Sequence, residues 1–204
     1  MTKESSWVRF VVGLLVLSVG LVLTIKAKLG VSPWNVFHIG LTKHFDLTVG
    51  RANQLTGLVV VGLSYIIARV QPTIATIVNI VLVGIFIDLI MPLFPVAQGA
   101  IEKYFYLFSG LFIFSLGVGM YISSQCGTGP RDSLMMALDR KLDIKLGLVR
   151  NGIELTVLII GYFLGVPVGI GTVCIALGVG PLVEWSLNVM NNLFSVTSAE
   201  AVKN

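Results

Sequence analysis

Two carboxylates stand within apolar runs of the chain, where charged side chains are rare. Asp88 lies in IFIDLIM and Glu184 lies in PLVEWSL. A charged side chain at the centre of a bilayer costs roughly 3 kcal/mol or more, and such residues often serve ion or proton relays. Asp88 and Glu184 are therefore candidates for ion or proton coupling, or for binding a cationic substrate. The alternative is that each carboxylate lies near the end of its helix, within reach of lipid headgroups.

A second set of polar residues follows two apolar runs in related motifs. Residues 30–35 read GVSPWN and residues 127–132 read GTGPRD. Proline suits the first position of a helix, where its missing N–H is not needed. Each motif therefore predicts a short helix that begins at Pro33 or Pro130. A helix N-terminus presents free N–H groups and a positive dipole, which bind anions. The candidate substrate-binding residues at these two helix ends are Ser32, Asn35, Arg131 and Asp132.

The two short helices have two interpretations. Segments 33–45 and 130–142 are amphipathic, and neither is apolar enough to cross a bilayer. They can lie flat at the membrane interface with their apolar face down. Alternatively, each is a re-entrant helix whose N-terminus points into a central cavity, where irregular backbone is tolerated at membrane depth. In the second case, two positive helix ends hold an anion or a substrate carboxylate.

The composition of the chain places these residues in a membrane. Of the 204 residues, 55% are hydrophobic and only 12% are charged, whereas soluble domains carry about 25% charged residues. A spanning helix needs roughly 20 mostly apolar residues. The sequence predicts an all-α polytopic membrane protein with a single membrane domain over residues 1–204 and spans at about 8–27, 54–71, 73–94, 103–123, 152–167 and 169–191.

The two halves of the chain match each other at an offset of 97, which becomes 96 after about residue 70. With three spans in each half, the second half enters the membrane from the opposite side, as in the inverted repeats of secondary transporters. We therefore expect inverted repeats at 8–97 and 103–191. The matched positions include Gly13 and Gly110, Ser18 and Ser115, Gly20 and Gly117, Gly30 and Gly127, Pro33 and Pro130, Asn35 and Asp132, Gly50 and Gly147, Thr76 and Thr172, Gly84 and Gly180, and Asp88 and Glu184.

The loops indicate how the chain is oriented. Lys and Arg residues are enriched in cytoplasmic loops, and more of them fall on one side when both termini are placed inside. The basic segment between Pro130 and Arg150 contributes most of this bias. We therefore expect a multi-pass membrane protein with both termini cytoplasmic, including a short tail at 192–204.

Several function classes lack support in the sequence. No HExxH, GxSxG, P-loop or GxGxxG motif stands in a suitable context, so no enzyme is expected. Cys126 and Cys174 have no CxxC or His-rich spacing, so neither a metal nor another cofactor is expected. The net charge of +4 is explained by loop topology, so no nucleic-acid partner is expected. His38 and His44 are expected to lie at the solvated interface.

Several of these segments together resemble a known family. They are KLGVSPWNVF, GRANQLTGLVVV, SQCGTGPRDSLMMAL and GLVRNGIELTVLIIG. Their order over residues 8–190 resembles the YczE/YyaS/YitT-type bacterial membrane proteins, and most closely the YczE branch. The resemblance implies a plasma-membrane protein with about six spans. That family is largely uncharacterised, so the resemblance implies no site residues.

The features above favour a small-solute transporter with a site between the two halves. A small molecule or ion would then be the substrate, and the lipid bilayer the surrounding partner. A second hypothesis is a membrane accessory protein that binds a partner through the basic segment carrying Arg140, Lys141 and Lys145. A third is the substrate-capturing subunit of a larger importer. A homo-oligomer or another membrane partner is compatible with each hypothesis.

Overall fold

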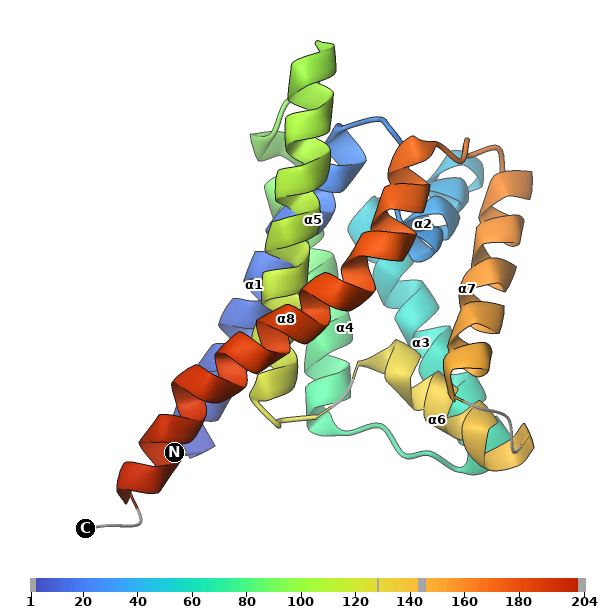
Figure 1. Ribbon diagram of the computed structural model, residues 1–204. Helices are drawn as coiled ribbons and strands as arrows, with labels where there is room; N and C mark the ends of the chain where they lie inside the picture. Colours follow the sequence, from blue (N-terminus) through green and yellow to red (C-terminus); the bar gives the residue numbers. More distant parts are fainter. Residues whose placement is uncertain (1–2, 128, 143–145, 202–204) are drawn as a thin grey trace.

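The computed structural model describes residues 3–127, 129–142 and 146–201, and these contain helices and no strand (Figure 1). One 3-10 turn, η1, covers Met91–Leu93. The α-helices are α1 (Lys3–Lys26), α2 (Pro33–His44), α3 (Val49–Ala68), α4 (Ile74–Ile90), α5 (Ala100–Ser123), α6 (Pro130–Leu142), α7 (Leu146–Phe163) and α8 (Ile170–Ala201).

Within the described ranges, four segments are long and apolar enough to cross a membrane. They are Ser6–Lys26, Ile74–Leu93, Ala100–Ser123 and Ile170–Phe194. The other two expected spans fall in α3 and α7. The first turns of α3 are polar, with Arg51, Asn53 and Gln54, which lowers the mean hydropathy of that helix. The expectation of an all-helical protein with apolar spans is confirmed, while the number six remains a prediction.

The centre of the bundle is the antiparallel pair α1 and α5, which packs closely because glycines face each other. A Cβ atom added at Gly13 would lie 3.0 Å from the carbonyl oxygen of Gly117, and one added at Gly20 would lie 2.5 Å from that of Gly110. Small residues at such crossings let helix backbones approach closely in lipid. Helix α1 is accordingly the most deeply buried of the four candidate spans.

The other helices surround this central pair. Helix α4 packs on α1 and α3, and α8 packs on α5. Each short helix packs on a helix of the other half of the chain: α2 packs on α7, and α6 packs on α3. Helices α7 and α8 lie close at their connecting loop and diverge toward the end of the bundle where both termini lie (Figure 1).

The short helices α2 and α6 begin at the prolines, as the motifs predicted. Helix α2 is not a surface helix, since Trp34, Asn35, Val36 and His38 are all buried. Helix α8 continues to Ala201, beyond the end of the last expected span at residue 191. The stretch after residue 191 contains neither Gly nor Pro to end the helix.

Candidate functional site

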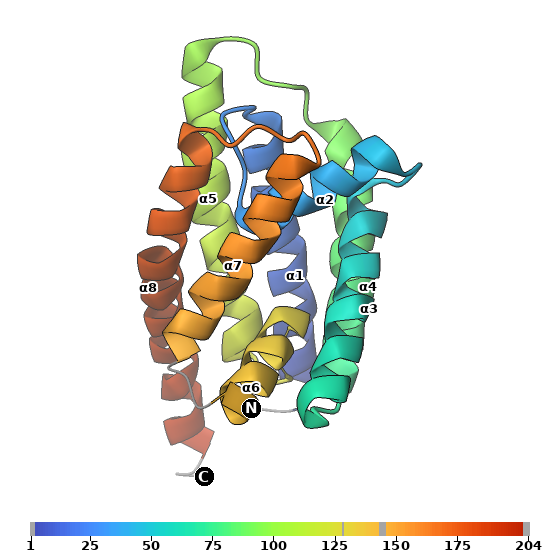
Figure 2. The ribbon, with the colours of Figure 1, turned by 90° about the vertical axis from the view of Figure 1, so that its right-hand side faces the viewer.

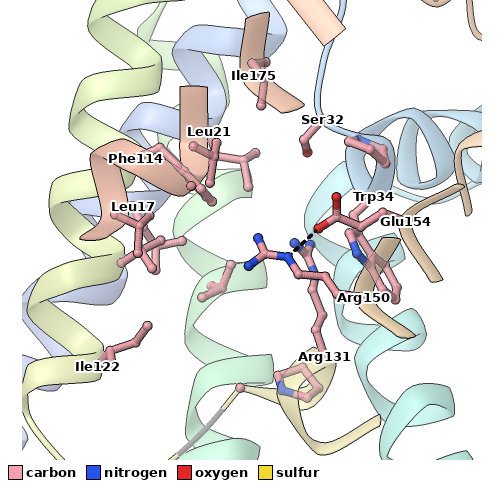
Figure 3. A pocket seen from close by; sticks show the side chains of 18 of the residues that line it. Leu17, Leu21, Ser32, Trp34, Phe114, Ile122, Arg131, Arg150, Glu154 and Ile175 are labelled. Atoms are coloured by element: carbon pink, nitrogen blue, oxygen red, sulfur yellow. Dashed lines mark hydrogen bonds and ion pairs between the residues drawn. The ribbon is translucent and has the colours of Figure 1, made fainter. Parts of the chain in front are cut away.

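A cavity of about 270 Å³ lies between the two halves of the chain (Figure 3). Most of its wall is apolar and comes from α1, α4, α5 and α8. The apolar side chains of this wall include Leu17, Leu21, Val83, Phe114, Val118, Ile122, Ile175, Val179 and Val183. Its polar side is formed by the starts of α2 and α6 together with α7.

Both Gly/Pro motifs reach this one cavity. Ser32, Pro33 and Trp34 line it from the first motif, and Gly129, Pro130 and Arg131 line it from the second. Each motif is held by the other half of the chain. A Cβ atom added at Gly30 would lie 2.7 Å from Thr172 Oγ1, and one added at Gly127 would lie 2.6 Å from Thr73 Oγ1. The backbone of Gly30 has a φ of +114°, which glycine adopts without strain.

Two guanidinium groups and one carboxylate lie at the polar side of the cavity. The Arg131 guanidinium carbon is 4.6 Å from the ring centroid of Trp34, a cation–π distance. Arg150 Nε donates to Glu154 Oε1 at 3.2 Å, one helical turn away on α7. Figure 3 shows the Arg131 side chain extending from below and the Arg150–Glu154 pair entering from α7. These three groups sum to one positive charge, and the side chains of Arg150 and Glu154 are 50% and 31% exposed.

The four predicted substrate-binding residues divide into three groups. Ser32 and Arg131 line the cavity. Asn35 is only 3% exposed on α2, is not among the residues that line the cavity, and its Oδ1 has no hydrogen-bond partner in the described part of the chain. Asp132 lies in the first turn of α6, but its side chain is outside the described residues.

Asp88 lies away from the cavity and caps helix α3. Its carboxylate oxygens accept hydrogen bonds from Thr48 Oγ1 at 2.6 Å and from the Gly50 N–H at 2.9 Å. Thr48 also accepts from the Arg51 N–H at the same helix end. A negative charge at a helix N-terminus is stabilised by the helix dipole and by the free N–H groups. The contacts of Asp88 therefore have a structural explanation, and its coupling role remains a prediction.

Glu184 is not among the residues that line the cavity either. It is exposed on α8, although its neighbours Gly180 and Val183 line the cavity from the same helix. Asp88 and Glu184 match each other in sequence, so their different surroundings are an asymmetry between the two halves. The coupling role of Glu184 remains a prediction as well.

Sequence reasoning missed four polar residues that line the cavity. Asn53, Asn79, Arg150 and Glu154 line the cavity, and none of them is among the candidate site residues predicted from the sequence. The spacing of Arg150 and Glu154 could have indicated two of them, because it puts opposite charges one turn apart on a helix face. Asn53 is the match of Arg150 at the offset of 97, so both halves place a polar residue there.

The expectation that His38 lies at a solvated interface is wrong. Its side chain is 1% exposed, and neither Nδ1 nor Nε2 has a hydrogen-bond partner among the described residues. The reason is that α2 packs inside the bundle against α7. Burial, followed by the nearby charge of Arg131, lowers the pKa of His38 to about 3. The imidazole is therefore neutral at physiological pH.

Comparison with known families assigns residues 5–188 to a family of unknown function, DUF6198. The chain belongs to this family. It is 38% identical over 182 residues to an uncharacterized membrane protein, YczE, of Bacillus subtilis (strain 168), covering 89% of this chain and 85% of that protein. It is also 28% identical over 166 residues to the uncharacterized protein YyaS of the same organism, covering 79% and 82%.

A further relative comes from Haemophilus influenzae (strain ATCC 51907 / DSM 11121 / KW20 / Rd). This uncharacterized protein is 26% identical over 178 residues, covering 87% of this chain and 81% of the relative. No solved structure matches the chain. The expected resemblance to YczE and YyaS is confirmed, and this DUF6198 member is a membrane protein whose apolar helices contact the lipid bilayer.

The cavity of this DUF6198 member carries groups that can bind an anion. Among the described residues that line it, the charged ones are two arginines and a glutamate, and arginine guanidinium groups bind carboxylates and phosphates through paired hydrogen bonds. The apolar wall opposite them excludes water from the rest of a bound molecule. A volume of about 270 Å³ is just below the range of about 300–1,000 Å³ typical of sites for drug-sized ligands. The arrangement therefore fits a small amphipathic anion.

Proposed function

We propose that this DUF6198 member is a small-solute transporter of the bacterial plasma membrane and not an enzyme. In this proposal α1, α3, α4, α5, α7 and α8 cross the membrane as two inverted halves, residues 8–97 and 103–191. The substrate binds in the cavity between the halves. Both termini lie at one end of the bundle (Figure 2), and the distribution of Lys and Arg favours the cytoplasm for that end.

One observation carries the proposal: the cavity is lined by matching positions of both halves. Transporters built from inverted repeats bind their substrates at the interface between the repeats. The matched residues that line this cavity are Leu17 and Phe114, Leu21 and Val118, Ser32 and Gly129, Pro33 and Pro130, Trp34 and Arg131, Asn53 and Arg150, Asn79 and Ile175, and Val83 and Val179.

The contacts between α1 and α5 support the same symmetry. Gly13 matches Gly110, and Gly20 matches Gly117. A twofold axis between the halves turns the contact of Gly13 with Gly117 into the contact of Gly110 with Gly20, and both contacts are present. The same axis relates the contact of Gly30 with Thr172 to the packing of Gly127 on the start of α4.

The substrate class follows from the charges of the cavity. Arg131 and Arg150 outnumber Glu154 among the charged lining residues that the structure describes, and these arginines favour an anionic group at that side. The apolar wall favours a short hydrocarbon or aromatic body on the same molecule. We therefore propose a small organic carboxylate or phosphate as the transported solute.

The first test is a thermal-unfolding screen of the detergent-purified protein against small carboxylates, phosphates, amines and sugars. A ligand at 100 times its dissociation constant stabilises a protein by about 2.7 kcal/mol. We expect dose-dependent stabilisation by anions, followed by uptake of the same anions into proteoliposomes. A flat screen together with absent uptake by well-folded protein would contradict the transporter proposal and favour a partner-binding accessory.

Two variants connect binding to the cavity. Arg131→Gln and Arg150→Gln should each weaken anion binding about tenfold or more, because each loses a charged hydrogen-bond donor. Arg69→Gln is the matched control, since Arg69 is exposed at the end of α3, beside Tyr65, and does not line the cavity. Equal effects of all three substitutions would show that anion binding does not occur in the cavity.

A further inference from the structure

Helices α3 and α4 form a closed pair in the first half. Asp88 on α4 binds the N-terminus of α3 through the Gly50 N–H, and a Cβ atom added at Gly50 would meet the carbonyl oxygen of Gly84. Gln54 Nε2 donates to the Val81 carbonyl at 3.0 Å. One turn further along α3, a Cβ atom added at Gly57 would lie 2.9 Å from Ile80 Cγ1.

The corresponding pair in the second half, α7 and α8, is open. Gly180 matches Gly84, yet an added Cβ atom there would have no described atom within 4 Å. Leu177 matches Val81 and is 74% exposed. Asn151 and Glu184, which match Gln54 and Asp88, are exposed as well. The two helices diverge toward the end of the bundle that holds the termini (Figure 1).

The set of residues that line the cavity reflects this difference between the halves. Eight of its lining residues belong to the second half and have no matched residue on the cavity wall: Tyr121, Ile122, Met135, Ile153, Glu154, Ala176, Gly180 and Val183. Their matches in the first half are Thr24, Ile25, His38, Thr56, Gly57, Ile80, Gly84 and Ile87, and all eight are buried. The same positions are therefore covered in one half and open in the other.

We propose that the two halves exchange these arrangements: in a second state α8 closes on α7, α4 separates from α3, and His38 becomes part of the cavity wall. The inference rests on the proposed transport function, because the exchange gives the central site access to the opposite membrane face. In this state Glu184 takes the place at the start of α7 that Asp88 has at the start of α3. Asp88 and Glu184 are positioning residues that hold alternate ends of the bundle closed.

The residues of the second half can make a closed pair like that of the first half. Gly147 and Gly180 match Gly50 and Gly84, so the same close backbone approach is available. At the next contact the first half packs Gly57 against the large Ile80. The second half has the large Glu154 in place of Gly57 and the small Ala176 in place of Ile80. The large residue is on α4 in the first pair and on α7 in the second pair. The space between the helices in a closed second pair is therefore similar to that in the first. Asn151 can donate to the Leu177 carbonyl as Gln54 does to that of Val81.

The exchange also explains the surroundings of His38. Both ring nitrogens are buried with no hydrogen-bond partner in the described ranges, an arrangement that disfavours the closed first half. Met135, the match of His38, lines the open cavity. When α4 separates from α3, His38 occupies the corresponding place and its nitrogens can bond to water or to the substrate. A buried polar group of this kind favours a second state in which it is hydrogen-bonded.

Disulfide trapping of the full-length protein in liposomes tests the exchange. In a Cys126→Ala and Cys174→Ala background, Gln54→Cys with Gly84→Cys reports the closed first half, because the Gln54 side chain lies against Gly84. Asn151→Cys with Gly180→Cys is the matched pair in the second half. We expect both pairs to form disulfides, and a protein carrying all four cysteines to form one disulfide or the other in each molecule. Formation of the first pair alone, or of both in one molecule, would overturn the proposal.

The accessibility of the cavity wall gives a second measurement, which is made before and after the disulfide is formed. His38→Cys should resist a water-soluble maleimide in the state described here and react after the Asn151→Cys and Gly180→Cys disulfide has formed. Met135→Cys should show the opposite pattern, whereas a His38→Cys thiol that stays protected in the trapped protein would contradict the exchange. Trapping without uptake of any solute would leave the exchange standing and overturn the transport function. Uptake of a solute by a protein that does not form the disulfides would overturn the exchange and leave the transport function standing.

Discussion

Arg131 lies over the indole ring of Trp34, and these two residues occupy the same position in the two halves of the chain. If the halves are inverted repeats as proposed, two matched residues can touch only where the twofold axis passes between them. In that proposal the contact marks the centre of the candidate site. It also shows that the site is not strictly symmetric, because one half contributes a cation and the other an aromatic ring.

The first prediction concerns this contact. Trp34→Leu removes the ring that faces the guanidinium, and a cation–π pair contributes about 1–2 kcal/mol where water is excluded. We expect anion affinity to fall about fivefold to thirtyfold, and Trp34→Phe to retain part of it. Titration calorimetry of Trp34→Leu, Arg131→Gln and the double variant measures the coupling. Additive effects of the two substitutions would show that Trp34 does not orient Arg131.

The second prediction concerns the crossing of α1 and α5. Gly20→Val places a branched side chain where the backbone of Phe114 already lies. The added side chain fits only if α1 and α5 move apart, which disrupts the central pair. We therefore expect the peak of folded protein to be lost in size-exclusion chromatography. Gly62→Ala is the control, because an added Cβ atom there meets no described atom within 4 Å. It should preserve or raise the melting temperature, since alanine is favoured over glycine in helices by about 1 kcal/mol.

The third prediction separates a structural role of Asp88 from a coupling role. Asp88→Asn weakens the cap on α3 and should destabilise the protein by about 1 kcal/mol, measured as a shift of the thermal unfolding midpoint. Glu184→Gln should leave stability in detergent nearly unchanged, because Glu184 is exposed in this state. Uptake by both variants is then measured in proteoliposomes under a proton gradient. Unchanged uptake in both would remove the proposed coupling role.

Parts of this architecture can be read from the sequence because they depend on local rules. The starts of α2 and α6 follow from proline at the first helical position, whereas the contact of Gly13 with Gly117 depends on the packing of α1 against α5. Ser32 and Arg131 were found because they stand beside those prolines. The burial of His38 was missed because it depends on α2 packing against α7, which no local pattern encodes. Asp88 was likewise seen as an acid in an apolar run, while its partner, the start of α3, is supplied only by the tertiary fold.

The last prediction uses the buried imidazole of His38. Its pKa falls from 6.5 to about 3 in the folded protein, so the unfolded chain binds more protons than the folded state between these values. Stability therefore falls as the pH drops below 6.5, by up to about 1.4 kcal/mol per pH unit. We expect the unfolding midpoint in denaturant to decrease between pH 6.5 and pH 5, and His38→Met, which copies the matched residue Met135, to flatten this part of the profile. His44→Met should keep the wild-type slope, because His44 is exposed at the end of α2. A slope that His38→Met leaves unchanged would assign the acid sensitivity to other groups.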